Sequence, residues 1–145
     1  MYKRILVPVE NSDADRTILD HVESLAKLTD GTLVLVHVAD GWAARHYDEL
    51  KLRESQEMRE DREYLERLQT DLSGRGLRVE TRLALGDPAR EICRVAEETG
   101  ADLIAMATHG HRGLSDVLHG ETVNHVRHTV RIPVLLLRAK PGRPT

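Results

Sequence analysis

A glycine-containing segment in the last third of the chain has the residue types needed to hold a phosphate group. Gly110 and Gly113 follow a predicted strand, and Gly120 stands where the next helix is expected to begin. Glycines let the backbone come close to a ligand, and a helix N-terminus presents unpaired N–H groups with a partial positive charge. The chain has neither a Walker A sequence nor a complete Gly-x-Gly-x-x-Gly. On these grounds alone, phosphate binding and simple chain turning are equally good interpretations.

Other candidate ligand-site residues follow three of the predicted strands. Parallel sheets bind ligands beyond the carboxyl ends of their strands, at the point where the strand order reverses. The residues at those ends are Pro8, Val9 and Glu10 after the first strand, Val38, Ala39 and Asp40 at the second, and Ala107 to Gly113 with Gly120, Glu121 and Thr122 after the fourth.

Three histidines in the same loop, His109, His111 and His119, raise the question of a metal site. No cysteine or pair of carboxylates completes a ligand set, so we interpret them as polar loop residues. The other histidines are scattered and receive no role: His21, His37, His46, His125 and His128. No nucleophile, base and orienting partner stand out together, which favours a binding protein over an enzyme.

The elements that would position these residues alternate strictly between strand and helix. Five apolar strands are predicted, at Ile5–Val9, Thr32–Val38, Leu77–Leu85, Asp102–Ala107 and Pro133–Leu137. This order predicts an α/β fold, a single open five-stranded parallel sheet with helices on both faces, as in Rossmann-like proteins. Residues of alternating polarity in the third strand indicate an edge or half-exposed strand.

Local signals predict where two of the helices begin and end. Ser12 can cap the first helix, Asp15 is favourable in its first turn, and Gly31 stands where a C-terminal glycine belongs. The second helix, from about Tyr47 to Leu72, is rich in charge with a thin apolar stripe, and we interpret it as a solvated helix.

Length and composition limit the class of protein. A chain of 145 residues suits one domain, expected over residues 1–140, with 141–145 as a frayed tail. A net charge of −3, no Phe and one Trp argue against nucleic acid as a partner, because neither a basic surface nor stacking platforms are available. A single cysteine and the lack of a long apolar stretch favour a cytoplasmic protein without membrane insertion.

Three stretches of the chain resemble the universal stress protein family. Ile5–Ser12 is similar to the family's opening, Ala105–Gly110 to its fourth strand and loop, and Gly120–Leu137 to its last helix and strand. Length and element order agree from Met1 to Arg138. The resemblance implies the adenine nucleotide alpha hydrolase-like variety of the α/β fold and, in one branch of the family, ATP binding.

In that branch the loop reads Gly, two residues, Gly, nine residues, Gly, and then Ser or Thr. The matching positions are Ala107, Gly110, Gly120 and Glu121, so the spacing is kept while two of the residue types differ. Glu121 puts a carboxylate where the family has a hydroxyl, although Thr122 follows it. A carboxylate about 4 Å from one phosphate charge costs ~4 kcal/mol at an effective dielectric constant near 20, unless the side chain points to solvent.

The resemblance also implies how a nucleotide would lie. Adenine and ribose would be surrounded by Pro8, Glu10, Val38 and Met106, and the phosphates by Gly110, Gly120 and the backbone of Glu121 and Thr122. Glu10 stands where the family usually has Asp. Arg112 would offset the charge of Glu121, or Mg²⁺ would bridge Glu121 to the phosphates.

Three functional hypotheses stay open at this point. The first is a regulatory or stress-response protein that binds ATP or AMP and, as the family implies, dimerises through the last strand, Ile132 to Arg138, an apolar edge that would otherwise be bare. The second is a stress protein that acts through protein partners without a nucleotide, a reading favoured by Ala107 and Glu121. The third is a slow ATPase, for which the sequence positions no base or water.

Overall fold

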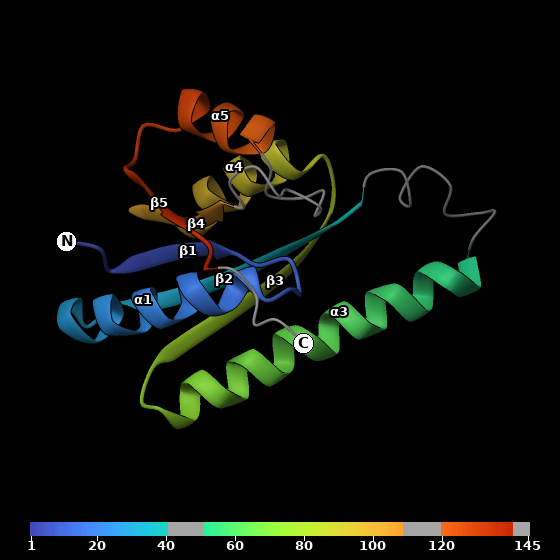
Figure 1. Ribbon diagram of the computed structural model, residues 1–145, viewed down its shortest axis with the longest axis horizontal. Helices are drawn as coiled ribbons and strands as arrows, with labels where there is room; N and C mark the ends of the chain where they lie inside the picture. Colours follow the sequence, from blue (N-terminus) through green and yellow to red (C-terminus); the bar gives the residue numbers. More distant parts are fainter. Residues whose placement is uncertain (41–50, 109–119, 141–145) are drawn as a thin grey trace.

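The computed structural model describes residues 1–40, 51–108 and 120–140 and confirms the alternation of strands and helices (Figure 1). In chain order the elements are β1 (Arg4–Pro8), α1 (Ala14–Thr29), β2 (Thr32–Asp40), α3 (Lys51–Gly74), β3 (Arg78–Gly86), α4 (Pro88–Thr99), β4 (Leu103–Thr108), α5 (Gly120–Thr129) and β5 (Val134–Arg138). The second strand runs two residues further than its apolar run, because Ala39 and Asp40 still pair with β3.

All five strands are parallel and lie in the order β3-β2-β1-β4-β5. The sheet is therefore the predicted open, Rossmann-like one, and β3 is at an edge as its alternating residues indicated. From β1 the chain moves outward through β2 to β3, and it then crosses back to β4 on the other side of β1 and continues to β5. The switch point thus falls between β1 and β4, where ligands bind in sheets of this kind.

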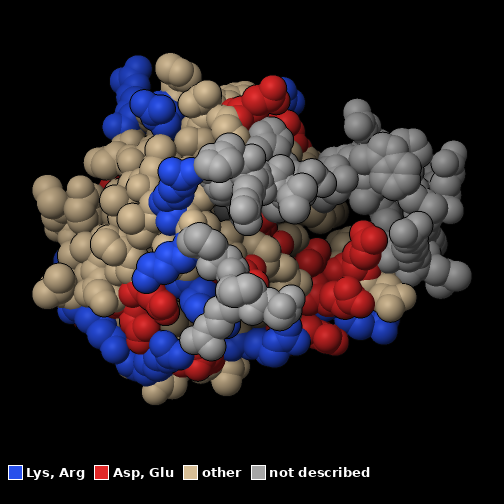
Figure 2. Space-filling model, viewed as in Figure 1, with Lys and Arg blue, Asp and Glu red and all other residues tan. Residues whose placement is uncertain are grey.

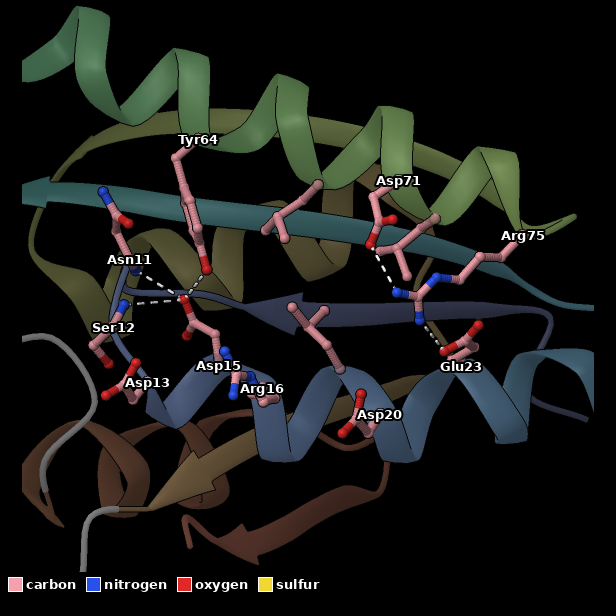
Figure 3. A pocket seen from close by; sticks show the side chains of 13 residues that line it. Asn11, Ser12, Asp13, Asp15, Arg16, Asp20, Glu23, Tyr64, Asp71 and Arg75 are labelled. Atoms are coloured by element: carbon pink, nitrogen blue, oxygen red, sulfur yellow. Dashed lines mark hydrogen bonds and ion pairs between the residues drawn. The ribbon is translucent and has the colours of Figure 1, made fainter. Parts of the chain in front are cut away.

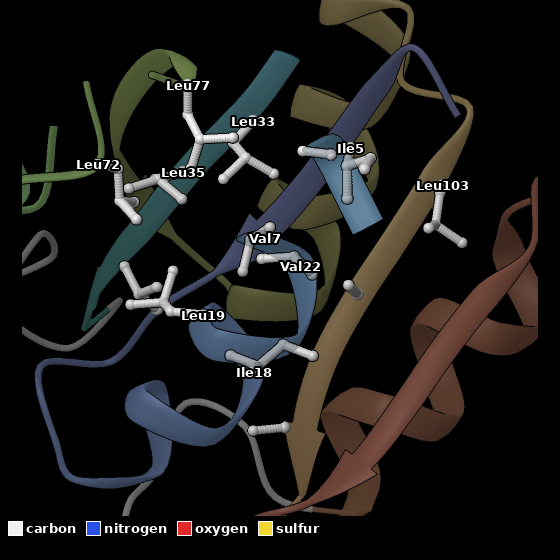
Figure 4. Close-up of a cluster of buried hydrophobic side chains, with 14 of the residues drawn as sticks. Ile5, Val7, Ile18, Leu19, Val22, Leu33, Leu35, Leu72, Leu77 and Leu103 are labelled. Carbon is white, nitrogen blue, oxygen red and sulfur yellow. The ribbon is translucent and has the colours of Figure 1, made fainter. Parts of the chain in front are cut away.

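Helices cover both faces of the sheet, α1 and α3 on one side and α4 and α5 on the other (Figure 1). Alternate residues of β1 face the two layers. Ile5 and Val7 pack toward α1 and α3 (Figure 4), whereas Leu6 packs toward α4 and α5. A central strand buried on both faces has to be apolar at every position, which explains the unbroken Ile5–Val7 run.

The ends of α1 differ in detail from the prediction. The N-cap residue is Asp13, not Ser12, although the Ser12 hydroxyl accepts a hydrogen bond from the Ala14 N–H at 3.3 Å. At the other end the left-handed residue is Asp30, with φ of 55°, and not Gly31. Gly31 is needed there for space, because a Cβ on it would lie 2.5 Å from the carbonyl oxygen of Tyr2.

The long charged helix α3 lies across β2 and β3 and buries only a thin stripe, including Leu65 and Leu72. Figure 2 shows charged side chains of both signs over the part of this face where α3 lies. The predicted start near Tyr47 falls outside the described residues. Among the described residues, no helix combines the length and the apolar character needed to cross a membrane.

Candidate functional site

The carboxyl ends of β1, β2 and β4 meet at the switch point, and the segment that follows β1 lies between them. Register pairs Pro8 with Val36 of β2 and Leu6 with Ile104 of β4. The Val9 N–H extends the ladder by donating to the Val36 carbonyl oxygen at 2.8 Å. The structure therefore brings the candidates of the first strand next to those of the second and fourth.

Glu10 is the acidic residue of this segment, and its side chain is buried, with 8% of the residue exposed. Burial of a carboxylate is costly unless polar groups surround it, so Glu10 is a candidate for a functional position.

The apolar candidates lie inside the core. Val38 and Met106 belong to the cluster beneath α4 and α5, and Ala107 belongs to the cluster on the α1 side. All three are at most 1% exposed. The methyl group of Ala107, which replaces the family's glycine, is therefore accommodated by the core.

The start of α5 presents the remaining described candidates. Gly120 and Glu121 are exposed, whereas Thr122 is buried. Among the described residues, a Cβ on Gly120 would meet no atom within 4 Å, so a side chain at this position has room. Gly110 and Arg112 lie outside the described residues, and so do the loop histidines His109, His111 and His119.

Asp15, to which the sequence assigned only a favourable place in a helix turn, organises the segment after β1 (Figure 3). Its carboxylate accepts hydrogen bonds from the N–H groups of Glu10 at 3.0 Å and Asn11 at 2.9 Å, and a longer one from Ser12 at 3.4 Å. The hydroxyl of Tyr64, from α3, donates to the same carboxylate. Burial raises the pKa of Asp15 above its usual value, against these bonds, which lower it.

His37 is a second functional residue that sequence reasoning missed. Nδ1 lies 2.9 Å from the carbonyl oxygen of Val9, and Nε2 lies 3.1 Å from the carboxylate of Asp61 on α3. Burial opposes a charge on the ring, but the bond to Asp61 and the charge of Asp61 outweigh it, so the pKa of His37 is raised. The available signal was a histidine inside a continuous apolar strand, because a buried polar group has to find partners.

A groove of about 540 Å³ runs between α1 and α3 (Figure 3). Asn11 and Ser12 line one end, and Arg75 lines the other, where it binds Glu23 at 3.0 Å and Asp71 at 3.2 Å. None of the residues selected from the sequence as ligand contacts lines this groove. The groove and the switch point meet only at the segment after β1.

Comparisons with known proteins agree with this architecture. The family model described as "Universal stress protein family" matches residues 1–138. Universal stress protein MJ0577 of Methanocaldococcus jannaschii is 28% identical over 97% of this chain and 97% of its own length. A solved structure of hypothetical protein MJ0577 has a TM-score of 0.84 at 27% identity and covers 98% of this chain and 99% of that one.

Two more distant structures share the fold. One is the universal stress protein from Archaeoglobus fulgidus in complex with dAMP, with a TM-score of 0.68, 22% identity and coverage of 93% and 97%. The other is a universal stress protein in complex with cAMP, with a TM-score of 0.65, 19% identity and coverage of 96% and 98%. Since the family model spans nearly the whole chain, the chain belongs to the universal stress protein family.

Proposed function

We propose that this chain is a cytoplasmic regulatory or stress-response protein that binds an adenine nucleotide, ATP or AMP, at the switch point between β1 and β4. The single observation that carries the proposal is the position of Glu121. Its side chain is exposed at the start of α5, while the neighbouring Thr122 is buried.

The exposure of Glu121 weakens the main argument against phosphate binding, because an exposed side chain is free to turn away from the phosphates into solvent. A carboxylate directed into the phosphate site would repel the ligand, whereas one in solvent is screened by water and salt. The start of α5 then keeps its unpaired N–H groups and its partial positive charge for an anion. The room around the Cα of Gly120 is consistent with close approach of a phosphate to the backbone.

The remaining contacts of the proposed nucleotide follow the resemblance residue by residue. Two proteins of the same fold hold adenine nucleotides, dAMP in one and cAMP in the other, which supports an adenine ligand here. In our proposal the base and ribose lie near the carboxyl ends of β1, β2 and β4, and the phosphates lie near the start of α5. The residues concerned are Pro8, Val9, Glu10, Val38, Met106, Ala107, Gly110, Arg112, Gly120, Glu121 and Thr122.

Gly120→Val is expected to weaken ATP binding at least tenfold, because a branched side chain would occupy the space through which a phosphate reaches the α5 backbone. The free protein should fold normally, since a Cβ at this position meets no protein atom within 4 Å. Isothermal titration of ATP with Mg²⁺, and separately of AMP, measures the effect. Gly74→Val is the matched control, because Gly74 is also a helical glycine with open space around it, at the far end of α3.

Mass spectrometry of the purified protein should precede the titration, so that a nucleotide carried through purification is detected. A micromolar dissociation constant that Gly120→Val weakens and Gly74→Val leaves unchanged would support the site. No heat up to millimolar ATP, with no nucleotide retained, would contradict it and favour the alternative of a stress protein that acts through protein partners.

We also propose that the protein is a homodimer that pairs through the last strand, Ile132 to Arg138. Within the described part of the chain, β5 pairs with β4 on one side only and forms an edge of the sheet. Its residues Leu135, Leu136 and Leu137 are only partly buried. An apolar edge of this kind invites pairing with a second chain, and two copies would cover each other's edges.

Leu136→Glu is expected to convert the dimer to a monomer, because it places a charge at the paired edge. Sedimentation velocity at micromolar concentration measures the change, and circular dichroism verifies that the variant is folded. Leu85→Glu is the matched control, since Leu85 is 44% exposed on β3 at the opposite edge. A wild-type protein that sediments as a monomer, or a Leu85→Glu variant that also dissociates, would argue against pairing through β5.

A further inference from the structure

Two polar side chains of α3 reach the segment after β1 from two directions. Asp61 and Tyr64 are three positions apart, so they project from the same side of the helix. Asp61 contacts His37, and Tyr64 contacts Asp15. His37 and Asp15 each continue to the backbone of the segment that the proposed function places against the nucleotide.

The first connection runs through His37 and requires a charged ring. Its Nδ1 faces a carbonyl oxygen, that of Val9, and its Nε2 faces a carboxylate, that of Asp61. Both neighbours only accept hydrogen bonds, so both ring nitrogens must carry a proton for both bonds to form. A neutral imidazole has one N–H and can keep only one of them. His37 is 6% exposed, so water has little access to replace the lost bond.

The second connection runs through Asp15 and does not depend on His37. The Asp15 carboxylate gathers the backbone N–H groups of Glu10 and Asn11, and the hydroxyl of Tyr64 donates to it from the other side. Asn11 has φ of 62°, a left-handed conformation that Asn adopts more readily than most residues, and its N–H is bonded to Asp15 in that conformation. Burial and the charge of Asp15 raise the pKa of Tyr64 far above its ordinary range, so the hydroxyl remains a donor at any physiological pH.

We propose that Asp61 and Tyr64 are positioning residues, which hold the segment after β1 in its ligand-binding conformation through His37 and Asp15. The placement of α3 and the affinity for the nucleotide are therefore coupled. The coupling is stronger when His37 is charged and weaker when it is neutral. This inference rests on the proposed function only in its second part, that the segment after β1 contacts the nucleotide.

The pH dependence follows from the groups around His37. Asp61 from α3 and Asp15 from α1 are the charged groups that act on it, Glu10 and Tyr64 lie beside Asp15, and the neighbour on β3 is the apolar Leu83. Against the effect of burial, the pKa of His37 is raised in the folded chain above the ordinary histidine value of 6.5 by the bond to Asp61 and the charge of Asp61. The connection from Asp61 through His37 to Val9 is thus complete below about pH 6.5 and is broken at one of its two bonds as the pH rises through the folded-state pKa.

The test uses the full chain with Asp61→Asn, which removes the charge and keeps the shape, and Tyr64→Phe, which removes only the hydroxyl. Glu60→Gln is the matched control, because it removes an exposed carboxylate from the same turn of α3. In the free protein, NMR-detected hydrogen exchange at the amides of Glu10 and Asn11 is expected to accelerate in Tyr64→Phe. The titration midpoint of His37 is expected to fall in Asp61→Asn. Glu60→Gln should change neither.

Titration of ATP into the same proteins tests the coupling. Each of the two variants is expected to bind about threefold to tenfold more weakly at pH 6, because Tyr64→Phe loses one hydrogen bond and Asp61→Asn replaces a charged hydrogen bond with a weaker neutral one. The affinity of the wild type and of Glu60→Gln for ATP should fall between pH 6 and pH 8, and that of Asp61→Asn should fall less. Titration of the nucleotide itself affects all of these proteins equally and therefore cancels in the comparison.

The inference would be overturned if Tyr64→Phe and Asp61→Asn matched Glu60→Gln both in the amide exchange rates of Glu10 and Asn11 and in the titration midpoint of His37. Unchanged ATP affinity in both variants, at both pH values, would overturn it as well. If the wild type binds no adenine nucleotide, the proposed function fails, and the exchange rates of the free protein still decide whether α3 positions the segment.

Discussion

Asp15→Ala is expected to lower the free energy of unfolding by about 3–5 kcal/mol, the range seen when a buried charge loses its partners. In this case the charge itself is removed and its partners remain. The N–H groups of Glu10 and Asn11 and the hydroxyl of Tyr64 lose their common acceptor. Each buried donor without an acceptor costs about 1–3 kcal/mol. The three contributions do not add fully, because water enters the space that the carboxylate occupied. Equilibrium unfolding in urea, followed by circular dichroism, measures the loss.

Asp20→Ala is the control for this prediction. Asp20 lies in the same helix and is exposed, so its replacement should change the stability by no more than about 0.5 kcal/mol. A loss for Asp15→Ala that is no larger than that of Asp20→Ala would show that the segment after β1 holds its conformation without the carboxylate. The role assigned to Tyr64 would then be lost too, because Tyr64 acts through Asp15.

Gly31→Ala is expected to destabilise the fold by about 3 kcal/mol, at the upper end of the usual cost of overpacking. The added Cβ would lie 2.5 Å from the carbonyl oxygen of Tyr2 and 2.9 Å from Oγ1 of Thr29. The first of these is a backbone atom and cannot move aside by rotation of a side chain. The chain must instead shift where it enters β1 and β2, next to the hydrogen bond from the Thr32 N–H to the Lys3 carbonyl oxygen at 2.8 Å.

Thermal and urea unfolding of Gly31→Ala beside Gly74→Ala separates this contact from a general effect of glycine replacement. Gly74 has no atom within 4 Å of a built Cβ, so alanine there should be neutral or slightly stabilising through its helix propensity. Equal stability of the two variants would mean that the entry to β1 and β2 adapts freely. In that case the close packing at Gly31 would contribute nothing to the stability of the sheet.

The first of these predictions concerns the same segment as the proposed function. Asp15 and His37 hold the two sides of one short stretch, the N–H groups of Glu10 and Asn11 on one side and the carbonyl oxygen of Val9 on the other. A backbone fixed in this way is preorganised for a ligand, which lowers the entropic cost of binding. Stability and ligand affinity should therefore fall together in variants of this network.

The sequence by itself determined the fold class, the order of the elements and the edge position of β3. Those features depend on local patterns, such as the unbroken apolar residues of Thr32–Val38 and the alternation of polar and apolar residues along β3. Such patterns can be recognised in a single sequence. The place of the proposed site also follows from the sequence, because the carboxyl ends of parallel strands meet at a switch point. The family followed from the motifs at Ile5–Ser12 and Gly120–Leu137.

Only the tertiary structure decided which polar side chains support that site. The partners of His37 and Asp15 cannot be identified from the sequence, since they are 24 and 49 positions away, at Asp61 and Tyr64. These contacts exist only because α3 packs across β2 beside α1, and no local pattern encodes the distance between two helices on one face of a sheet. The direction of Glu121 is a fact of the same kind: a helix turns successive residues by about 100°, so the start of α5 decides that Glu121 faces solvent and Thr122 the core.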